Sequence, residues 1–435
     1  MPDALTPPPR RRRSLRSEAL RSASLRSARP SPLLALLVAG LLAVAGCADG
    51  TPGADLESGD VVQLDSLEVE TLYRVGELDG TGWEAFGRVS GVEFMADGSL
   101  LIVDPGQSHV VVLDPDGEFV RTFGRQGQGP GEFQSVQRAV VLGSGEIALP
   151  DMSQARVHVF GPDGTYRRSV STPHAEGVPG GRIGAHGESG IVGAKATIIM
   201  SAGPGQTPDL PDTRPIGFWE LGPDAPEPRN RVIHEAWLPR METTQTVTVG
   251  GFSVGAMTAF LPSLRSASLP DGRVALADST TYRIQIVDPV DGAVDVLERP
   301  HAPWPVTEAD EGDHRRYMEE EDSGNQIQIM GPGGPIDASE LMRARLENMM
   351  FWPERAIIQS LDADRDGRLW VRRSTRNLRE EGPVDLLRAD GSYLGTLPAG
   401  TTIPDAFGPD GLAAWIERDE FDVSYVHVGR ITNLP

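Results

Sequence analysis

The chain has 435 residues and a formal net charge of −22, from 40 basic and 62 acidic side chains. So acidic a surface repels phosphate backbones and excludes nucleic-acid binding, which needs a basic footprint. The 50 glycines and 36 prolines favour a fold with many tight turns, and the single cysteine excludes an internal disulfide.

The first 46 residues have the pattern of an export signal. Eight arginines precede an apolar run over residues 32–46, which is shorter than the roughly 20 residues of a membrane-spanning helix. The run ends in the tetrapeptide VAGC, which resembles the lipobox of bacterial lipoproteins and puts Cys47 at the lipid-acceptor position. We therefore expect residues 1–46 to be a lipoprotein signal peptide and Cys47 to carry the lipid. An ordinary signal peptide with an incidental cysteine is the alternative.

Residues 47–60 are polar and contain several glycines, which predicts a flexible tether. Removal of residues 1–46 takes away eight arginines and two acids, so the net charge of the mature chain is −28. We expect this chain to be exported and held by its lipid in the bacterial cell envelope, at a periplasmic or outer-membrane face. Residues 61–435 remain for one folded domain, which is expected to be a monomer.

A unit of four short strands recurs after the tether. The first copy, residues 89–133, alternates apolar and polar residues and contains the turns Asp97-Gly98 and Asp116-Gly117. Further copies follow at intervals of roughly 40–50 residues, which is typical of propeller blades rather than of a solenoid. The predicted blades are 89–133, 134–173, 180–263, 264–306, 357–399, and 400–432 together with 61–76.

The two ends of this repeat predict how the ring closes. Residues 61–75 alternate like a strand, whereas the last unit is one strand short. The N-terminal strand is therefore expected to complete the C-terminal blade, which removes the open sheet edges of a linear array. The predicted fold class is all-β, a six-bladed β-propeller of four-stranded antiparallel blades with a small helical insertion.

Residues 307–352 interrupt the repeat with a helical pattern. Thr307 before three acids, and Asp337 before Glu340, predict two helix N-termini. The insertion is expected to lie over one face of the disc as a lid or partner-binding element, and a filler of an irregular blade junction is an equal alternative. The side chains of the predicted partner-binding surface are Trp304, Tyr317, Leu346, Met349 and Trp352.

Two motifs carry a family resemblance. The connector FGRQGQGPGEF at 123–133 looks like the FG..G.GPGEF connector of the NHL-type propellers, and RVHVF at 156–160 and RIQIV at 283–287 look like their R-I-Q-V-F strand. The chain is similar in particular to the six-bladed propeller lipoproteins of bacteria. That resemblance implies the fold but no particular function, because the group has no agreed activity. The connector occurs once in full, and the third blade lacks the pattern.

The triplet Asp362, Asp364 and Asp366, followed by Gly367, resembles the first half of a calcium-binding loop. Alternating carboxylates supply the oxygen ligands that Ca²⁺ prefers. However, Arg373 stands where the loop needs a bidentate glutamate, and the other blades have a plain Asp-Gly turn at this place. A Ca²⁺ site therefore stays open beside the favoured interpretation of a hairpin turn.

Two other motifs are typical of enzymes but lack the surroundings that catalysis needs. Ser253 lies in a G-x-S-x-G pattern, yet Pro262 follows too soon for the long helix of a nucleophile elbow. The glycine-rich segment 124–131 precedes a strand rather than a helix N-terminus, which favours a turn over a phosphate site. No catalytic residue is predicted from either.

The sequence therefore favours a binding or scaffold function for a protein, peptide or glycan partner, exercised outside the cytoplasm from a lipid anchor. The alternative is a hydrolase or lyase, because enzymes of this architecture use a metal in the central channel. Such a site needs histidines or carboxylates that converge from several blades, and the eight histidines here are scattered.

Overall fold

The computed structural model describes residues 62–78, 82–174, 177–196, 212–223, 230–241, 245–250, 252–322, 328–331 and 334–435. All of them belong to the unit Asp55–Pro435. The predicted signal peptide, Cys47 and the tether lie outside the described residues.

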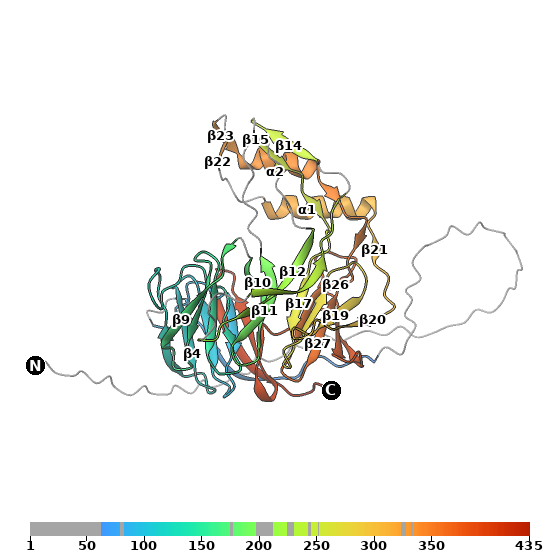
Figure 1. Cartoon of the computed structure of the whole chain (residues 1–435). Helices are drawn as coiled ribbons and strands as arrows, with labels where there is room; N and C mark the ends of the chain where they lie inside the picture. The colour runs from blue at the N-terminus through green and yellow to red at the C-terminus, as the bar shows by residue number, and fades with distance from the viewer. Residues whose placement is uncertain are drawn as a thin grey trace, which may run out of the picture. The chain divides into compact units, whose positions relative to one another are not determined.

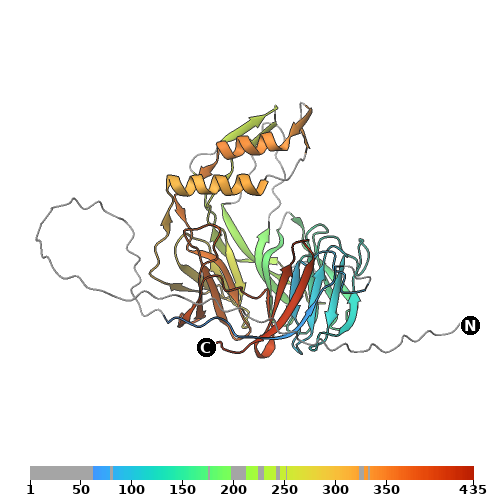
Figure 2. The same ribbon diagram turned by 180° about the vertical axis from the view of Figure 1, so that it is seen from behind.

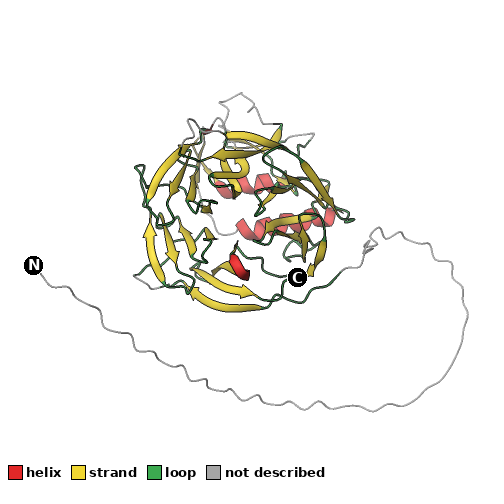
Figure 3. Ribbon diagram, turned by 60° about the horizontal axis from the view of Figure 1, so that its bottom comes forward, coloured by secondary structure: helices red, strands yellow, loops and turns green. Residues whose placement is uncertain are grey.

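Six four-stranded antiparallel sheets form the ring of a propeller (Figure 1 and Figure 3). Blades 1 to 3 consist of β2 (Gly91–Phe94), β3 (Leu100–Asp104), β4 (His109–Leu113), β5 (Phe119–Phe123); β6 (Val140–Val141), β7 (Ile147–Asp151), β8 (Arg156–Phe160), β9 (Tyr166–Ser171); and β10 (Val178–His186), β11 (Gly190–Ala196), β12 (Thr213–Glu220), β13 (Asn230–Trp237). Blades 4 to 6 consist of β17 (Arg265–Ser268), β18 (Val274–Ala277), β19 (Arg283–Val287), β20 (Val294–Glu298); β26 (Ile358–Ala363), β27 (Arg368–Arg373), β28 (Val384–Arg388), β29 (Tyr393–Leu397); and β30 (Ala406–Phe407), β31 (Leu412–Arg418), β32 (Ser424–Ile431), β1 (Val69–Val75). The predicted fold and the predicted number of blades are confirmed.

The blades pack on both of their faces, which explains the apolar middle strands. In β3, Leu100 and Ile102 contribute to the core between blades 6 and 1, whereas Leu101 and Val103 contribute to the core between blades 1 and 2. Alternation along the strand therefore fills two cores at once. Four further clusters fill the remaining interfaces between neighbouring blades around the ring.

The N-terminal strand closes the ring as predicted. β1 pairs antiparallel with β32, so that Val69 faces Ile431 and Val75 faces Val426. The segment just before β1 bonds to the neighbouring blade 5, because Leu64 N–H donates to the Thr396 carbonyl at 2.9 Å. The predicted single strand over 61–75 is thus divided between two blades.

The inserted segments fold together above one face of the ring (Figure 1 and Figure 2). We call this element the cap. Its helices are α1 (Glu308–Asp322) and α2 (Ala338–Glu347), and its strands are β14 (Thr246–Val249), β15 (Phe252–Gly255), β16 (Thr258–Ala259), β21 (Trp304–Pro305), β22 (Gln328–Gly331), β23 (Gly334–Asp337), β24 (Met350–Phe351) and β25 (Glu354–Arg355). Both predicted helices are present. The strand-like stretch 244–252, predicted as part of blade 3, belongs instead to the cap.

Neither helix of the cap, nor any other helix in the described ranges, combines the length and the hydropathy that a bilayer-spanning helix needs. The cap helices instead pack on each other, and α2 also packs on β14. Helix α1 begins with a capping box, because Thr307 N–H donates to the Asp310 carboxylate at 2.9 Å and Asp310 N–H donates to Thr307 Oγ1 at 3.3 Å.

A buried aspartate ends the second strand of blades 1 and 2 and holds the connector that enters each of them. Asp104 accepts the backbone N–H groups of Gly87 and Arg88 at 2.8 and 2.9 Å, and Asp151 accepts Gln134 N–H at 2.6 Å. These bonds fix where β2 and β6 start, and hence what they present to the centre of the ring. In blade 4, Asp278 directly follows β18 and accepts the N–H of Trp237, the last residue of β13, at 2.7 Å.

The substitution Asp151→Asn tests the energetic contribution of this contact. Burial alone would raise the pKa of this carboxyl, but the His158 ring 3.8 Å away and hydrogen bonds from the Gln134 and Gln154 amides outweigh it and hold the pKa at about 2. A carboxyl with a lowered folded-state pKa contributes stability above its unfolded pKa and loses it as the pH falls through the folded pKa. We expect the variant to lower the free energy of unfolding by about 2.5 kcal/mol at pH 7 and by about half of that at pH 3.

Urea unfolding of both proteins at the two pH values measures this difference. Asp97→Asn is the matched control, because Asp97 lies in an exposed turn and the amide keeps an acceptor for Ser99 N–H. An equal loss of stability at both pH values would show that the charge of Asp151 is not the cause.

Candidate functional site

A cavity of about 250 Å³ occupies the centre of the ring, and every blade lines it. The walls come from the innermost strands β2, β6, β10 and β17, from the end of β26 and from β30. Apolar side chains such as Val141, Ile183 and Phe407 lie beside charged ones. We call this cavity the channel.

Each innermost strand, or one of the two residues before it, contributes a charged side chain to the channel or directly beside it. Blades 2, 3 and 4 contribute Arg138, Arg182 and Arg265, and we call this set the cationic arc. Blades 5, 6 and 1 contribute Asp362, Asp405 and Glu93, and we call this set the acidic arc; Asp405 and Glu93 line the cavity, and Asp362 lies beside it in contact with Arg182. Arg265 lines a second cavity that adjoins the cap. The two arcs therefore occupy opposite halves of the ring.

Two ion pairs link charged groups across the channel. Arg182 of blade 3 contacts the buried Asp362 of blade 5. Arg365, in the turn after β26, pairs with Glu93 at 2.7 Å and also donates to the carbonyl groups of Phe94 and Phe407 at 2.9 and 3.0 Å. Arg365 of blade 5 thus contacts residues of the innermost strands of blades 6 and 1.

Desolvation shifts the pKa values of both arcs against their charged forms. Burial raises the pKa of Glu93, Asp362 and Asp405, and the nearby arginines oppose this only in part. Burial lowers the pKa of the Arg138 and Arg265 guanidinium groups, and neighbouring Arg182 lowers it further. Each arc would consequently gain from a ligand group of opposite charge.

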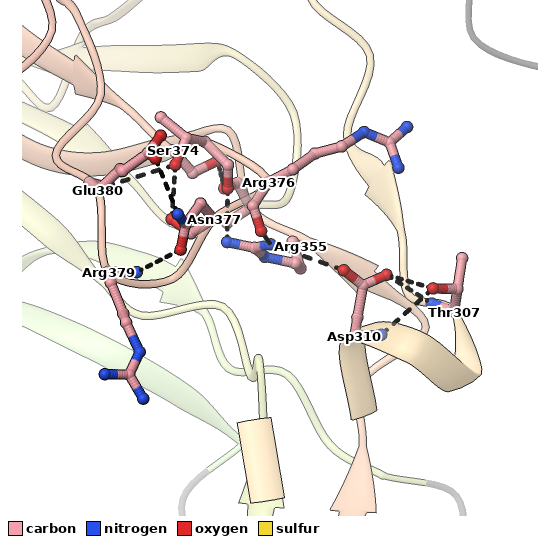
Figure 4. Close-up of polar contacts among 10 residues, drawn as sticks. Thr307, Asp310, Arg355, Ser374, Arg376, Asn377, Arg379 and Glu380 are labelled. Carbon is pink, nitrogen blue, oxygen red and sulfur yellow. Dashed lines mark hydrogen bonds and ion pairs between the residues drawn. The ribbon is translucent and has the colours of Figure 1, made fainter. Parts of the chain in front are cut away.

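Beneath the cap, a cavity of about 160 Å³ lies between blades 4 and 5 and the inserted segments. Arg355 crosses this junction, as Figure 4 shows. Its guanidinium donates to the Thr375 and Arg376 carbonyl groups at 2.6 and 2.7 Å and lies 3.9 Å from the Asp310 carboxylate of α1. Arg355 therefore ties the cap to the loop that follows β27.

The three aspartates of the predicted cation site are divided between two environments. Asp362 contacts Arg182 at the channel. Asp364 and Asp366 both pair with Arg368, at 3.1 and 2.5 Å, within the hairpin turn. In the part of the chain that the structure describes, no three His, Cys, Asp or Glu side chains form a group suited to a metal. A cation at this turn would have to displace Arg368.

The predicted partner-binding residues of the insertion do not form one surface. Leu346 and Met349 are buried with Ala259 in the core of the cap, so they cannot contact a partner in this conformation. Trp304 packs under Arg376, and Trp352 packs against Trp237 with ring centroids 5.8 Å apart. Tyr317 lies near Arg379 at the edge of the cap. This set mainly builds the cap and its junction with the blades.

The two enzyme-like motifs lie in the cap and in a connector between blades. Ser253 lies in the β14–β15 hairpin, where its hydroxyl is 2.8 Å from that of Thr248. The glycine-rich segment 124–131 is a connector between blades, as predicted. In it the Glu132 carboxylate accepts Gly129 N–H at 2.8 Å.

Comparison with known proteins supports the fold and leaves the function open. A family profile described as a 6-bladed beta-propeller matches residues 83–173, which is less than half of the chain. No curated protein matches the sequence. A Bacteroides fragilis protein described as exported is 12% identical, with a TM-score of 0.45 and coverage of 86% of this chain and 99% of its own.

Two further solved structures resemble the chain at a similar level. A Bacteroides vulgatus protein of a family without a described function is 11% identical, with a TM-score of 0.46 and coverage of 85% of this chain and 99% of its own. Virginiamycin B lyase of Staphylococcus aureus is 10% identical, with a TM-score of 0.39 and coverage of 84% and 90%. Likenesses this distant carry no conclusion about this chain.

The substitution Arg355→Met tests whether this side chain holds the cap. The variant loses two charge-assisted hydrogen bonds to backbone carbonyl groups, so we expect local opening of the cap to become easier by about 2 kcal/mol, or roughly 30-fold. Hydrogen exchange of the α1 amides measures this opening. Arg343→Met, on an exposed position of α2, is the control. Unchanged α1 exchange in Arg355→Met would contradict the assignment.

Proposed function

We propose that this chain is a binding protein of the bacterial cell envelope, lipid-anchored through Cys47, whose peptide, protein or glycan ligand enters the central channel. The observation that carries the proposal is the convergence of a charged side chain from each of the six blades on or beside one water-accessible cavity. Charged groups gathered at the centre of a ring are costly for stability alone, because each is partly desolvated. Their convergence is therefore better explained by a ligand.

The side chains around the channel favour a binding protein over a metal-dependent hydrolase or lyase. A divalent cation in the channel would need carboxylates that are available as ligands. Here Glu93 and Asp362 face the guanidinium groups of Arg365 and Arg182. Four arginines in the vicinity, Arg138 and Arg265 included, would also repel a cation.

A crosslinking experiment in intact cells tests where the ligand binds. Phe407 lines the channel, whereas Phe421 is 70% exposed at an outer turn of blade 6. We expect photocrosslinking p-benzoylphenylalanine at position 407, but not at 421, to give ligand adducts that mass spectrometry detects on the purified chain. Adducts from position 421 alone, or from neither position, would contradict a channel-bound ligand.

The anchor is tested separately by Cys47→Ser. If the VAGC tetrapeptide is a lipobox, the serine variant cannot be acylated, and we expect it to lose fatty-acid labelling and to leave the membrane fraction. Ala48→Ser, one position further on, is the control. Continued labelling of the Cys47→Ser variant would overturn the assignment.

A further inference from the structure

We propose that the channel binds a small zwitterion of the α-amino-acid type, which is an amino acid or a short peptide. Its carboxylate would face the cationic arc, and its ammonium group would face the acidic arc. This inference rests on the proposed binding function and narrows its peptide ligand to a short peptide or to the single amino acid of which peptides are made.

The separation of charge around the ring is the first reason. Arg138, Arg182 and Arg265 come from three consecutive blades, and Asp362, Asp405 and Glu93 come from the three consecutive blades opposite. A channel that only neutralised itself would gain most from charges that alternate from blade to blade. Segregated arcs instead create a dipolar cavity, which is complementary to a molecule with separated charges.

The second reason is that each arc retains a group without an ion-pair partner. Within the described ranges, the Arg138 side chain has no ion pair or hydrogen bond, although it is exposed to the channel. Asp405 accepts only the Ile416 backbone N–H, at 2.7 Å, and no guanidinium lies within 4 Å of it. Nε of Arg265 is buried without a hydrogen-bond partner among the described residues. Both a carboxylate and an ammonium group would therefore find a partner.

A zwitterion fits these groups better than a simple ion does. The channel is lined by three arginines, Arg138, Arg182 and Arg365, and by three carboxylates, Glu93, Asp364 and Asp405, so its formal charges cancel. An inorganic anion would pair with Arg138 but would leave the Asp405 carboxylate without an ion-pair partner. A cation would meet Arg138 and Arg182. A ligand with both charges compensates both arcs.

The size and the walls of the channel limit the ligand further. A volume of about 250 Å³ lies just below the range of about 300–1,000 Å³ typical of small-molecule sites. The apolar wall residues Val141, Ile183, Leu269 and Phe407 leave room for a small aliphatic side chain. Single amino acids and dipeptides meet these limits.

Calorimetry and thermal shift with the purified mature chain test the proposal. The probes are the twenty standard L-amino acids and L-alanyl-L-alanine, each compared with analogues that lack one charge. For alanine these analogues are N-acetyl-L-alanine and L-alaninamide, and acetate, succinate and inorganic phosphate are the simple anions. We expect at least one zwitterion to bind at least tenfold more tightly than either of its analogues and than each simple anion.

Two channel variants test which charged group of the ligand faces each arc. Arg138→Gln should weaken the binding of the best zwitterion at least tenfold. It should leave the binding of the amide analogue unaffected, because the amide has no carboxylate that could pair with Arg138. Asp405→Asn should weaken the same zwitterion but leave its N-acetyl analogue unaffected. Arg388→Gln, at the exposed end of β28, and Asp97→Asn, in the exposed turn between β2 and β3, are the matched controls and should bind like the unmodified chain.

Several outcomes would overturn the proposal. Equal or tighter binding of acetate, succinate or phosphate would identify an anion site, and the absence of binding by every amino acid and dipeptide would exclude this ligand class. In both cases, adducts from p-benzoylphenylalanine at position 407 would still support a channel that binds a ligand of another class. If those adducts are absent as well, both the zwitterion proposal and the proposed binding function are contradicted.

Discussion

The pairing of the first strand with the last is the interaction on which the rest of the structure depends. Without β1 beside β32, blade 6 would expose an unpaired edge and the ring could not close. Closure brings blade 6 beside blade 1, where a shared core joins Phe94 and Leu412. The channel exists only in the closed ring, because its charged lining is assembled from all six blades.

The blades could be predicted because a local pattern determines each of them. Alternation of apolar and polar residues and Asp-Gly turns predict hairpins from neighbouring residues alone. The number of repeats then predicts the number of blades. The cap helices were predicted in the same way, from the capping residues Thr307 and Asp337. The hairpin β14–β15 was assigned to blade 3 because nothing local indicates that it packs on helix α2, almost a hundred residues further along the chain.

The sequence alone does not predict the channel, because the pattern of its charged residues appears only when the sequences of the blades are aligned at their turn glycines. Glu93, Arg182 and Asp362 each lie five positions before a turn glycine, and Arg138 and Arg265 lie seven positions before one. Odd spacings place all five on the same side of a strand. That side faces the channel, but only the ring geometry shows which strand of a blade is innermost. Read alone, Asp362 looked like a calcium ligand.

The strand exchange between the two ends of the chain also constrains the order of folding. Glu68 N–H bonds to the Asn433 side chain, 365 positions away, and contacts of such long range form slowly because a very large loop must close first. During synthesis the N-terminal end emerges first, yet its partner strand is the last to arrive. Blades 1 to 5 can therefore fold before the ring does, and Asp405 of the acidic arc is the last charged residue of the channel to take its place.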